Sequence, residues 1–488
     1  MNTRTEFALP PVTLRIGGQA RSVGAGIHQH INPATGQPDA TVPLAGAAEV
    51  DEAVNAAHQA FSIWRTTPAG ARAKALLKLA QLVEEHTEEF ADLAIADNGI
   101  ARSTATATVA AAVEWIRYYG GWADKLPLGR ITSVVGAGGS FGHTLRQPYG
   151  VIGVIITWNA PLMSLAMKVP AALAAGNTVV VKPSELTPFS AMLFADLISE
   201  AGIPAGVFNV IPGGAEAGAA LVEHPLVKKV TFTGGPATAR KITTACAQTF
   251  KPVLLELGGK SANLIFADAD LEAAAMYSAF MAFGVMSGQA CALPTRLLVE
   301  DSIYDAFVAK VAAIAASFKV GNPQEPDTIC GPVINQGAID RIDSMVKRAQ
   351  EQGARVVTGG QRLDGDLAEG FYYPPTVLAD VDPSSELAKK EVFGPVLAAI
   401  RFSDEAEALA IANGTEYGLS GSVWTGDSRR AIRLAEALET GEVAVNGAPI
   451  AVAERPFGGI GHSGNGNEGG LEGLEEFFWT KSVAYGNG

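Results

Sequence analysis

The chain has 488 residues, of which 48% are hydrophobic and 18% are charged. This length exceeds what one hydrophobic core usually fills, so we expect at least two domains, and the composition excludes a largely disordered chain. The formal net charge of -14 comes from 36 Lys plus Arg against 50 Asp plus Glu. Nucleic acid is therefore not expected as a partner, because a protein that binds the phosphate backbone needs positive charge.

The ends and the cysteines of the sequence bear on its location. No apolar run of signal-peptide length opens the chain, and no stretch of about 18 residues has the character of a membrane span. We therefore expect a cytoplasmic protein without a membrane partner. Cys246, Cys291 and Cys330 are too few for a disulfide framework and lack the spacing of a zinc site, so reduced thiols and no metal are expected.

Helical periodicity dominates the first quarter of the chain, over 49–64 and again over 71–96. Beyond it, short β-branched runs alternate with helical stretches, and these runs cover 151–157, 178–182, 207–211, 227–233 and 252–257. The alternation predicts an α/β fold with a parallel sheet, and the unbroken apolar runs predict helices on both faces, as in Rossmann-like, doubly wound sheets. A dinucleotide site is then expected at the C-terminal ends of the strands.

A second alternation follows a strand expected at 261–266. It predicts a second α/β domain, with strands at 296–300, 354–359 and 396–402 and helices at 304–318 and 338–352. The C-terminal segment EFFWTKSVAY alternates weakly and is predicted to be a strand, with which the segment 126–145 could pair. Exposed strands of this kind often join subunits, and burial within one monomer is the alternative.

Cys291 is the candidate nucleophile. It lies in SGQACALPTR, among small neighbours that would let another molecule approach the sulfur. The alternative is a buried small apolar residue, which is how we interpret Cys246 and Cys330. A free thiol with a pKa of about 8.5 is only a few per cent thiolate at pH 7, so a nucleophilic Cys needs a base or a positive environment.

Two polar residues are candidate helpers for that thiol. Glu256, in LLELGGKS, ends an apolar strand, and the apolar surroundings should raise its pKa and suit it to general-base work. Asn159, in TWNAP, could donate its amide N–H to an oxyanion. A structural ion pair would explain Glu256 equally well, and a turn would explain Asn159.

Two further motifs fit a dinucleotide. Lys182 and Glu185, in VVVKPSELTP, follow the most apolar run and could bind a ribose. The segment FTGGPATAR, 232–240, places glycines and a Pro at an expected helix N-terminus, where backbone N–H groups favour a pyrophosphate. It is not a G-x-G-x-x-G motif, and a strand-to-helix turn without a ligand is its alternative.

Taken together, the motifs resemble those of the aldehyde dehydrogenase superfamily. Ten of them follow one another in the family's order over residues 45–482: TWNAP, GNTVVVKPSE, GIPAGVFNV, FTGG, LELGGKSANLIFADADL, GQAC, GNPQEPDTICGPVIN, EVFGPV, YGLSGSVW and PFGG. The resemblance implies a cofactor domain from 1–124 and 148–259, a catalytic domain from 260–460, and a bridging β element from 125–147 and 461–488. It also implies a homodimer or homotetramer.

The resemblance assigns roles to individual residues. Cys291 is the nucleophile, Glu256 the general base, Asn159 the oxyanion donor together with the Cys291 N–H, and Lys168 lies near the proton path. Glu391 and Phe393 match the positions that hold the nicotinamide ribose and the nicotinamide. The full set of expected cofactor contacts is Thr157, Trp158, Lys182, Ser184, Glu185, Gly213, Phe232, Thr233, Gly234, Gly235, Leu257, Glu391 and Phe393.

Cofactor and substrate preferences follow from the same positions. The negative charge of Glu185 would repel the 2'-phosphate of NADP, so NAD is expected and NADP is the weaker alternative. By position, an apolar entry tunnel is lined by Ala160, Met163, Ser164, Met167, Ala290, Ala292 and Phe457. An aromatic or medium-chain apolar aldehyde is therefore the expected substrate, although the loop 448–454 could bring in Arg455 for a carboxylated one.

Three other functions are weighed against this one. A CoA-acylating dehydrogenase needs no water-activating base, so Glu256 argues against it. A non-catalytic protein on the same fold would not need Cys291, Glu256 and Asn159 together, and a thiol hydrolase would leave the cofactor motifs unexplained. The sequence also departs from the family pattern at three positions: Ala239 stands where Gly is common, and His462 and Asn467 stand where many members have Lys and Arg.

Overall fold

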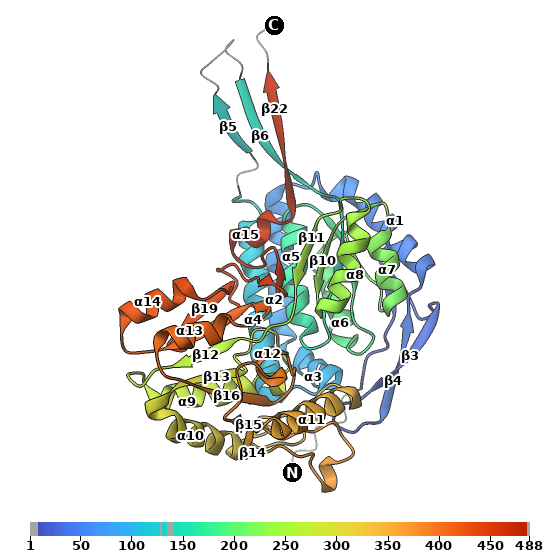
Figure 1. Ribbon diagram of the computed structural model, residues 1–488. Coiled ribbons are helices and arrows are strands. Elements are labelled where there is room, and N and C mark those ends of the chain that lie inside the picture. Colours follow the sequence, from blue (N-terminus) through green and yellow to red (C-terminus); the bar gives the residue numbers. More distant parts are fainter. Residues whose placement is uncertain (1–7, 127–128, 134–140, 486–488) are drawn as a thin grey trace.

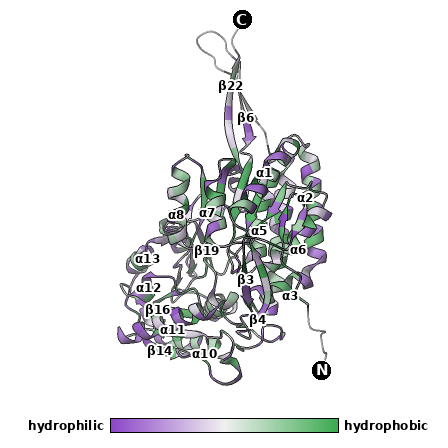
Figure 2. Ribbon diagram, turned by 90° about the vertical axis from the view of Figure 1, so that its right-hand side faces the viewer, coloured by the Kyte–Doolittle hydropathy of each residue, from purple (hydrophilic) through white to green (hydrophobic). Residues whose placement is uncertain are grey.

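A computed structural model describes residues 8–126, 129–133 and 141–485 of the chain. Two α/β bodies, each built on one large sheet, lie against each other, and a three-stranded sheet projects from them (Figure 1). The expected α/β fold is confirmed. Figure 2 shows the central strands as the most hydrophobic ribbons, with mixed hydropathy on the helices around them.

The first sheet has eight strands, and its five middle strands are parallel. These five match the predicted runs, while the short antiparallel strands at its edges were not predicted. In spatial order the strands are β2 (Gln19–Arg21), β1 (Leu14–Ile16), β9 (Phe208–Val210), β8 (Thr178–Lys182), β7 (Val151–Ile155), β10 (Val227–Thr233), β11 (Val253–Glu256) and β21 (Gly464–Asn465).

Helices cover both faces of this sheet, as the apolar runs predicted. Val179 and Val181 of β8 pack into the core formed with α2–α6, whereas Val180 packs on the opposite face with α1, α7 and α8. The helical region expected over 71–96 is two helices, because the chain turns at His86. The helices are α1 (Ala47–Trp64), α2 (Ala69–Glu85), α3 (Thr87–Asn98), α4 (Arg102–Trp122), α5 (Pro161–Ala174), α6 (Phe189–Glu200), α7 (Ala215–Glu223) and α8 (Pro236–Ala247).

The second sheet has seven strands, parallel except for β14. In order they are β14 (Arg355–Thr358), β15 (Thr376–Ala379), β16 (Val396–Phe402), β13 (Arg296–Glu300), β12 (Ala262–Ile265), β18 (Ser420–Trp424) and β19 (Glu442–Val445). Its helices are α9 (Leu271–Ala279), α10 (Tyr304–Ser317), α11 (Gln336–Glu351), α12 (Glu386–Lys389), α13 (Glu405–Asn413) and α14 (Ser428–Ala437). Again both faces are covered, by separate apolar cores.

The projecting sheet confirms the predicted C-terminal strand and its partner segment. β22 (Phe478–Tyr485) pairs antiparallel with β6 (Phe141–Pro148) along its whole length, and β6 pairs with β5 (Gly129–Ser133). Residues 127–128 and 134–140 of the partner segment lie outside the described residues. Whether this sheet joins subunits stays a prediction.

The remaining elements are small: β3 (Gly26–Ile31) pairs with β4 (Pro38–Leu44), β17 (Tyr417–Gly418) pairs with β20 (Ile460–Gly461), and α15 (Gly470–Glu475) precedes β22. β21 lies within the segment 461–488 that was expected to bridge, yet it extends the first sheet. The domain limits themselves stay a prediction. No helix in the described part of the chain is long and apolar enough to cross a membrane.

Candidate active site

The predicted site residues meet at one edge of the first sheet. From β7 the chain continues through β8 and β9 on one side and returns to β10 and β11 on the other, so the order of the strands reverses between β7 and β10. Ligands of α/β proteins bind outside the carboxyl ends of the strands at such a switch point. Asn159 follows β7, Thr233 ends β10, and Glu256 ends β11 in register with Thr233.

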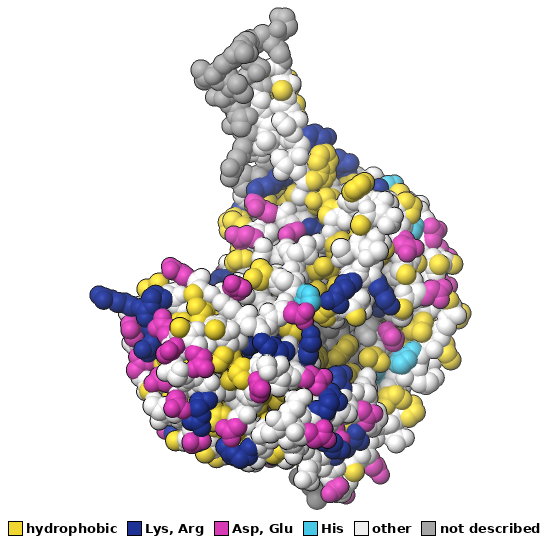
Figure 3. Space-filling model, viewed as in Figure 1, with side chains coloured by type: hydrophobic (Ala, Val, Ile, Leu, Met, Phe, Trp, Pro, Cys, Tyr) yellow, Lys and Arg dark blue, Asp and Glu magenta, His cyan; other side chains and the backbone are white. Residues whose placement is uncertain are grey.

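Cys291 reaches this edge from the second body. The segment 257–261 crosses from β11 to β12, and a Cβ on Gly259 would collide with the main-chain oxygen of Cys291. Only glycine therefore allows the two segments to touch. Figure 3 shows the surface hollowed between the two bodies, with charged side chains around the rim.

A strained turn precedes Cys291. Met286, Ser287 and Gly288 have φ of 51°, 51° and 75°, in the left-handed region that non-glycine residues rarely adopt. The turn is held by the Ser287 hydroxyl, which donates to the oxygen of Gly331 at 2.9 Å, and by Gly288, where a Cβ would collide with the Gly394 oxygen. The residues 280–284 before it form a π-helix. None of this was predicted from the sequence.

The Cys291 sulfur is a thiol at neutral pH. Its pKa is raised to about 12, first by burial and then by the negative charges of Glu256 and Glu391, against a lowering by the N–H groups of Cys291 and Ala292. The positive environment that would create a resting thiolate is not found here. Attack by this sulfur therefore requires a base to take its proton.

Glu256 has the properties of such a base. Its side chain is only 2% exposed, and within the described residues neither carboxylate oxygen has a hydrogen-bond partner. Burial raises its pKa well above the usual value, the charge of Glu468 raises it further, and Lys168 opposes them. The predicted direction is confirmed, and the carboxylate is free to accept a proton from a thiol or a water.

Lys168 is paired with a residue that the sequence did not reveal. It lies on α5, fully buried, and its Nζ forms an ion pair with Glu468 and donates to the Thr231 hydroxyl at 3.1 Å. Glu468 is 300 positions away in the chain and belongs to none of the quoted motifs. The pair lies close enough to Glu256 for both charges to act on its pKa.

Asn159 is 8% exposed, and its amide is held on two sides. Its Nδ2 donates to the main-chain oxygen of Gln289 at 2.7 Å, and its Oδ1 accepts from the Thr157 hydroxyl at 2.8 Å. Asn98 of α3, also unpredicted, donates to the main-chain oxygen of Asn159 at 2.7 Å. The contact with Gln289 brings the amide to the segment that carries Cys291.

The ribose motif is assembled at the end of β8. The Lys182 ammonium donates to the oxygens of Pro183, at 3.0 Å, and Gly213. Burial lowers its pKa to about 8, against the charge of Glu185. A Cβ on Gly214 would lie 3.9 Å from Glu185 Oε1, so the carboxylate faces the same loop. Ser184 caps the turn by accepting from Leu186 N–H at 3.2 Å.

The N-terminus of α8 is open to an anion. Gly235 precedes the first-turn Pro236, and a Cβ built on Gly235 meets nothing within 4 Å. A Cβ on Gly234 would collide with the Phe232 ring, and the Gly234 N–H donates to the Glu256 oxygen at 3.0 Å. Free N–H groups, an open approach and the helix dipole fit a pyrophosphate.

Glu391 and Phe393, the residues expected at the nicotinamide, belong to the second body. Glu391 accepts from the Gly259 N–H at 3.1 Å, and burial raises its pKa to about 7, against that hydrogen bond and the charges of Lys260 and Arg341. The rings of Trp158 and Phe393 meet edge to face with centroids 5.3 Å apart. The Leu257 N–H donates to the Ser463 oxygen at 3.0 Å, and this hydrogen bond holds the crossing segment 257–261 at its start.

The expected tunnel residues include no charged side chain. Met163, Met167 and Cys291 are half-buried against the core that contains Ala292 and Phe457, while Ser164 is buried and Ala160 and Ala290 are half-buried. Arg455, the one candidate cation, is held by Glu442 at 3.2 Å and by the Pro449 oxygen.

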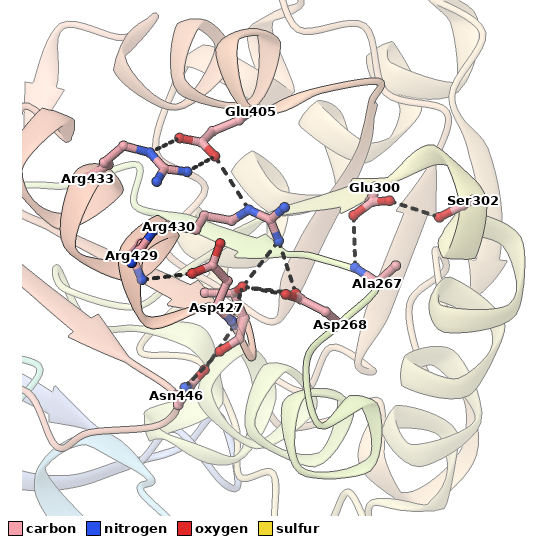
Figure 4. Close-up of polar contacts among 11 residues, drawn as sticks. Ala267, Asp268, Glu300, Ser302, Glu405, Asp427, Arg429, Arg430, Arg433 and Asn446 are labelled. Atoms are coloured by element: carbon pink, nitrogen blue, oxygen red, sulfur yellow. Dashed lines mark hydrogen bonds and ion pairs between the residues drawn. The ribbon is translucent and has the colours of Figure 1, made fainter.

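The loop that carries Arg455 is anchored at its start and at its centre. At its start Asn446 exchanges two hydrogen bonds of 3.0 Å with the main chain of Thr425, in the polar network around Arg430 and Asp268 (Figure 4). At its centre Ala451, with φ of 53°, accepts from the Trp115 indole at 3.3 Å. These contacts therefore hold the loop in one position.

Comparison with known proteins decides the family. The model of the aldehyde dehydrogenase family matches residues 22–483. The chain belongs to this family. Two relatives of the dehydrogenase are (Z)-2-((N-methylformamido)methylene)-5-hydroxybutyrolactone dehydrogenase of Acinetobacter baylyi, 43% identical over 94% of each chain, and human 4-trimethylaminobutyraldehyde dehydrogenase, 39% identical over 99% of this chain and 98% of its own.

Solved structures agree with the fold of this dehydrogenase. PnpE from Pseudomonas sp. WBC-3, solved with nicotinamide adenine dinucleotide, has a TM-score of 0.95 with 40% identity over 98% of both chains. A variant of aldehyde dehydrogenase C from Pseudomonas syringae, solved with NAD+ and octanal, has a TM-score of 0.93 with 36% identity over 98% of both chains.

The structure shows the contacts of two residues that depart from the family pattern. His462 lies 3.6 Å from the Glu416 carboxylate, which also pairs with Lys390 at 2.6 Å. Ala239 is buried on α8 against the first sheet. Nothing in the structure explains Asn467.

Among the described residues, no group of three or more His, Cys, Asp or Glu side chains is placed to hold a metal ion.

Proposed function

We propose that this dehydrogenase oxidises an apolar aldehyde, aromatic or of medium chain length, to the carboxylic acid with NAD. The observation that carries the proposal is the convergence on Cys291 of an unpaired buried carboxylate, Glu256, and an amide donor, Asn159, at the switch point of a dinucleotide-type sheet. The absence of charge among the expected tunnel residues supports the substrate class.

The first half of the reaction forms a thioester. Glu256 takes the Cys291 proton, and the sulfur attacks the aldehyde carbon, forming a C–S bond. The oxygen of the thiohemiacetal becomes an oxyanion held by Asn159 Nδ2 and the Cys291 N–H. The nicotinamide that Glu391 and Phe393 would hold would supply hydride acceptance, and the acyl group would then remain on sulfur.

The second half hydrolyses the thioester. Glu256 first releases the Cys291 proton to solvent and then removes a proton from a water, whose oxygen attacks the acyl carbon. The C–S bond breaks with its electron pair on sulfur, the sulfur takes the proton back from Glu256, and the acid is released. The raised pKa of Glu256 supports this double use, because a carboxyl whose pKa lies nearer to neutrality is the stronger base.

NAD would be held by residues whose placement fits it. The open N-terminus of α8 suits the pyrophosphate, Lys182 and Glu185 suit the adenine-side ribose, and Glu391 with Phe393 suits the nicotinamide side. Two similar structures contain NAD, which supports the choice. The carboxylate of Glu185 disfavours a 2'-phosphate, so kcat/KM with NAD should exceed that with NADP.

A panel of aldehydes tests the proposal. Benzaldehyde, hexanal, octanal and succinic semialdehyde are assayed for NADH formation, and the product is identified as free acid by mass spectrometry. We expect the first three to exceed the semialdehyde in kcat/KM, because Arg455 is already paired. Formation of acyl-CoA in the presence of CoA, or a preference for the semialdehyde, contradicts it.

A second test replaces the nucleophile and uses another cysteine as the control. Cys291→Ala should abolish NADH formation while NAD binding, measured by calorimetry, is retained. Cys246→Ala, which removes a buried thiol on α8, should keep its activity. Equal activity of Cys291→Ala and the wild type would show that another group forms the covalent bond.

A further inference from the structure

The orientation of the Asn159 amide decides whether it can stabilise an oxyanion. Turning the amide by 180° exchanges its N–H groups for its carbonyl oxygen, and the torsion that does so is soft in asparagine. One orientation presents a donor to the substrate oxygen, and the other presents an acceptor that repels it. Something in the protein must therefore select and hold the productive orientation.

The Gln289 main-chain oxygen makes the selection. It can only accept, and it lies 2.7 Å from the Asn159 nitrogen. The turned amide would place two acceptor oxygens against each other at that distance, which is unfavourable for a buried pair. The NH2 end therefore faces the segment that carries Cys291.

The Thr157 hydroxyl holds the other end. Its Oγ1 donates to Asn159 Oδ1 at 2.8 Å, two residues away along the turn that follows β7. Asn98 fixes the main chain at the same place, donating to the Asn159 oxygen at 2.7 Å and to the Trp158 oxygen at 3.4 Å. With these contacts made, one N–H of the amide has no protein partner among the described residues and is left for the substrate oxygen.

We propose that Thr157 is a positioning residue for the oxyanion donor Asn159, rather than a residue whose side chain contacts the cofactor. The inference rests on the proposed function, because it takes Asn159 as the donor. The Thr157 hydroxyl acts in every step that forms an oxyanion at Cys291 and in none that binds NAD.

Thr157→Val tests the role with a side chain of nearly the same shape. The probe is p-nitrophenyl acetate: the Cys291 sulfur forms a bond to the acetyl carbon, the ester C–O bond breaks, p-nitrophenolate leaves with the electron pair, and the thiol proton passes to base. Neither NAD nor an aldehyde is needed. Loss of one hydrogen bond should slow this acylation by about three- to tenfold, and Thr157→Ser should recover most of the rate.

A double-mutant cycle separates positioning from a general effect on the fold. Asn159→Ala should slow acylation by about 10²- to 10³-fold, and adding Thr157→Val to it should change the rate by less than about twofold, because the amide it positions is gone. Slow rates are followed by mass spectrometry of the acetyl-enzyme. Thr178→Val is the matched control, since it removes a buried hydroxyl that donates to the Ala57 oxygen at 2.9 Å in the neighbouring strand β8.

The outcomes distinguish this inference from the proposed function. An equal loss from Thr157→Val in both backgrounds, or a raised NAD dissociation constant with unchanged acylation, overturns the positioning role. An enzyme that acetylates with the expected pattern but oxidises no aldehyde refutes the proposed function and leaves the role of Thr157 standing. A wild-type enzyme that the ester does not acylate at Cys291 refutes both.

Discussion

Two buried charges of opposite sign act on the carboxyl of Glu256. Glu468 raises the pKa of this carboxyl and Lys168 lowers it, although these two side chains also form an ion pair with each other. The pair is thus more than a structural contact. Together with burial, its two members set the pH at which the general base becomes available.

Removing either partner should move that pH in a predictable direction. Only the ionised form of Glu256 accepts a proton, so hydrolysis of the acetyl-enzyme rises with pH through the pKa of Glu256. Lys168→Met removes the positive charge and should shift the rise to higher pH, and Glu468→Gln should shift it to lower pH. The measurement is the hydrolysis rate of preformed acetyl-enzyme against pH.

Two controls frame this result. Glu256→Gln should abolish the rise, and Lys229→Met should leave its midpoint in place, although it also removes a buried lysine from an ion pair, with Glu476. Each single change in the Lys168 pair leaves a buried partner unpaired and should cost about 3–5 kcal/mol of stability, so folding is checked by urea denaturation. Shifts in the same direction for both variants would rule out a charge effect.

Residues could be predicted where a motif or a strand end marked them. Glu256 ends an apolar run, and Cys291 has small neighbours, so local sequence was enough to mark them as candidates, and the resemblance to the family assigned their roles. Asn98 and Glu468 could not be found this way, because they act through contacts with residues 61 and 300 positions away. The raised pKa of Cys291 was also hidden, since it depends first on burial in the folded protein and then on carboxylates brought from two different segments.

At the scale of elements, the left-handed turn over Met286–Gly288 is what brings Cys291 to the first sheet. Two non-glycine residues adopt positive φ there, and such strain persists only where the surrounding structure enforces it. Gly288 is the tightest point, because its α-carbon faces the main chain at Gly394. The turn therefore couples the nucleophile to the loop that follows Glu391.

Gly288→Ala should disturb both stability and activity. A methyl group there meets a positive φ of 75° and the Gly394 main chain, and we expect a loss of about 2–5 kcal/mol in the free energy of unfolding. Gly121→Ala, on α4, is the matched control: its Cβ meets nothing within 4 Å, and helix propensity should stabilise the protein by less than about 1 kcal/mol. Equal denaturation midpoints for the two variants would contradict this account.

Elements were predictable where a run of apolar residues was long enough to set a period. The middle strands of the first sheet are such runs, and β8 and β10 were located to the residue. β1, β2 and β21 have two or three residues each, too few to show any period. Their places at the sheet edges follow from tertiary contacts and not from local sequence.

At the scale of the whole molecule, the projecting sheet has exposed strand edges and exposed aromatic rings that contacts within one chain do not explain. Within the described residues β22 and β5 are the edge strands of this sheet (Figure 1). The sheet carries the half-exposed aromatic rings of Trp479 (39%) and Tyr485 (52%). An exposed strand edge beside apolar side chains is a template for another chain. We propose that this sheet is where subunits of the dehydrogenase meet.

Replacing the two rings tests that proposal, and replacing an exposed ring outside the sheet is the control. If Trp479 and Tyr485 are buried between subunits, Trp479→Ala combined with Tyr485→Ala should raise the dissociation constant of the oligomer at least about tenfold, because buried aromatic anchors dominate interface energy. Phe250→Ala is the control, since Phe250 is 94% exposed on the turn after α8 and is not part of the projecting sheet. Sedimentation equilibrium gives the assembly state of each. A monomeric wild type, or equal weakening by Phe250→Ala, would remove the sheet as the interface, because the argument depends on the rings being covered by a second chain.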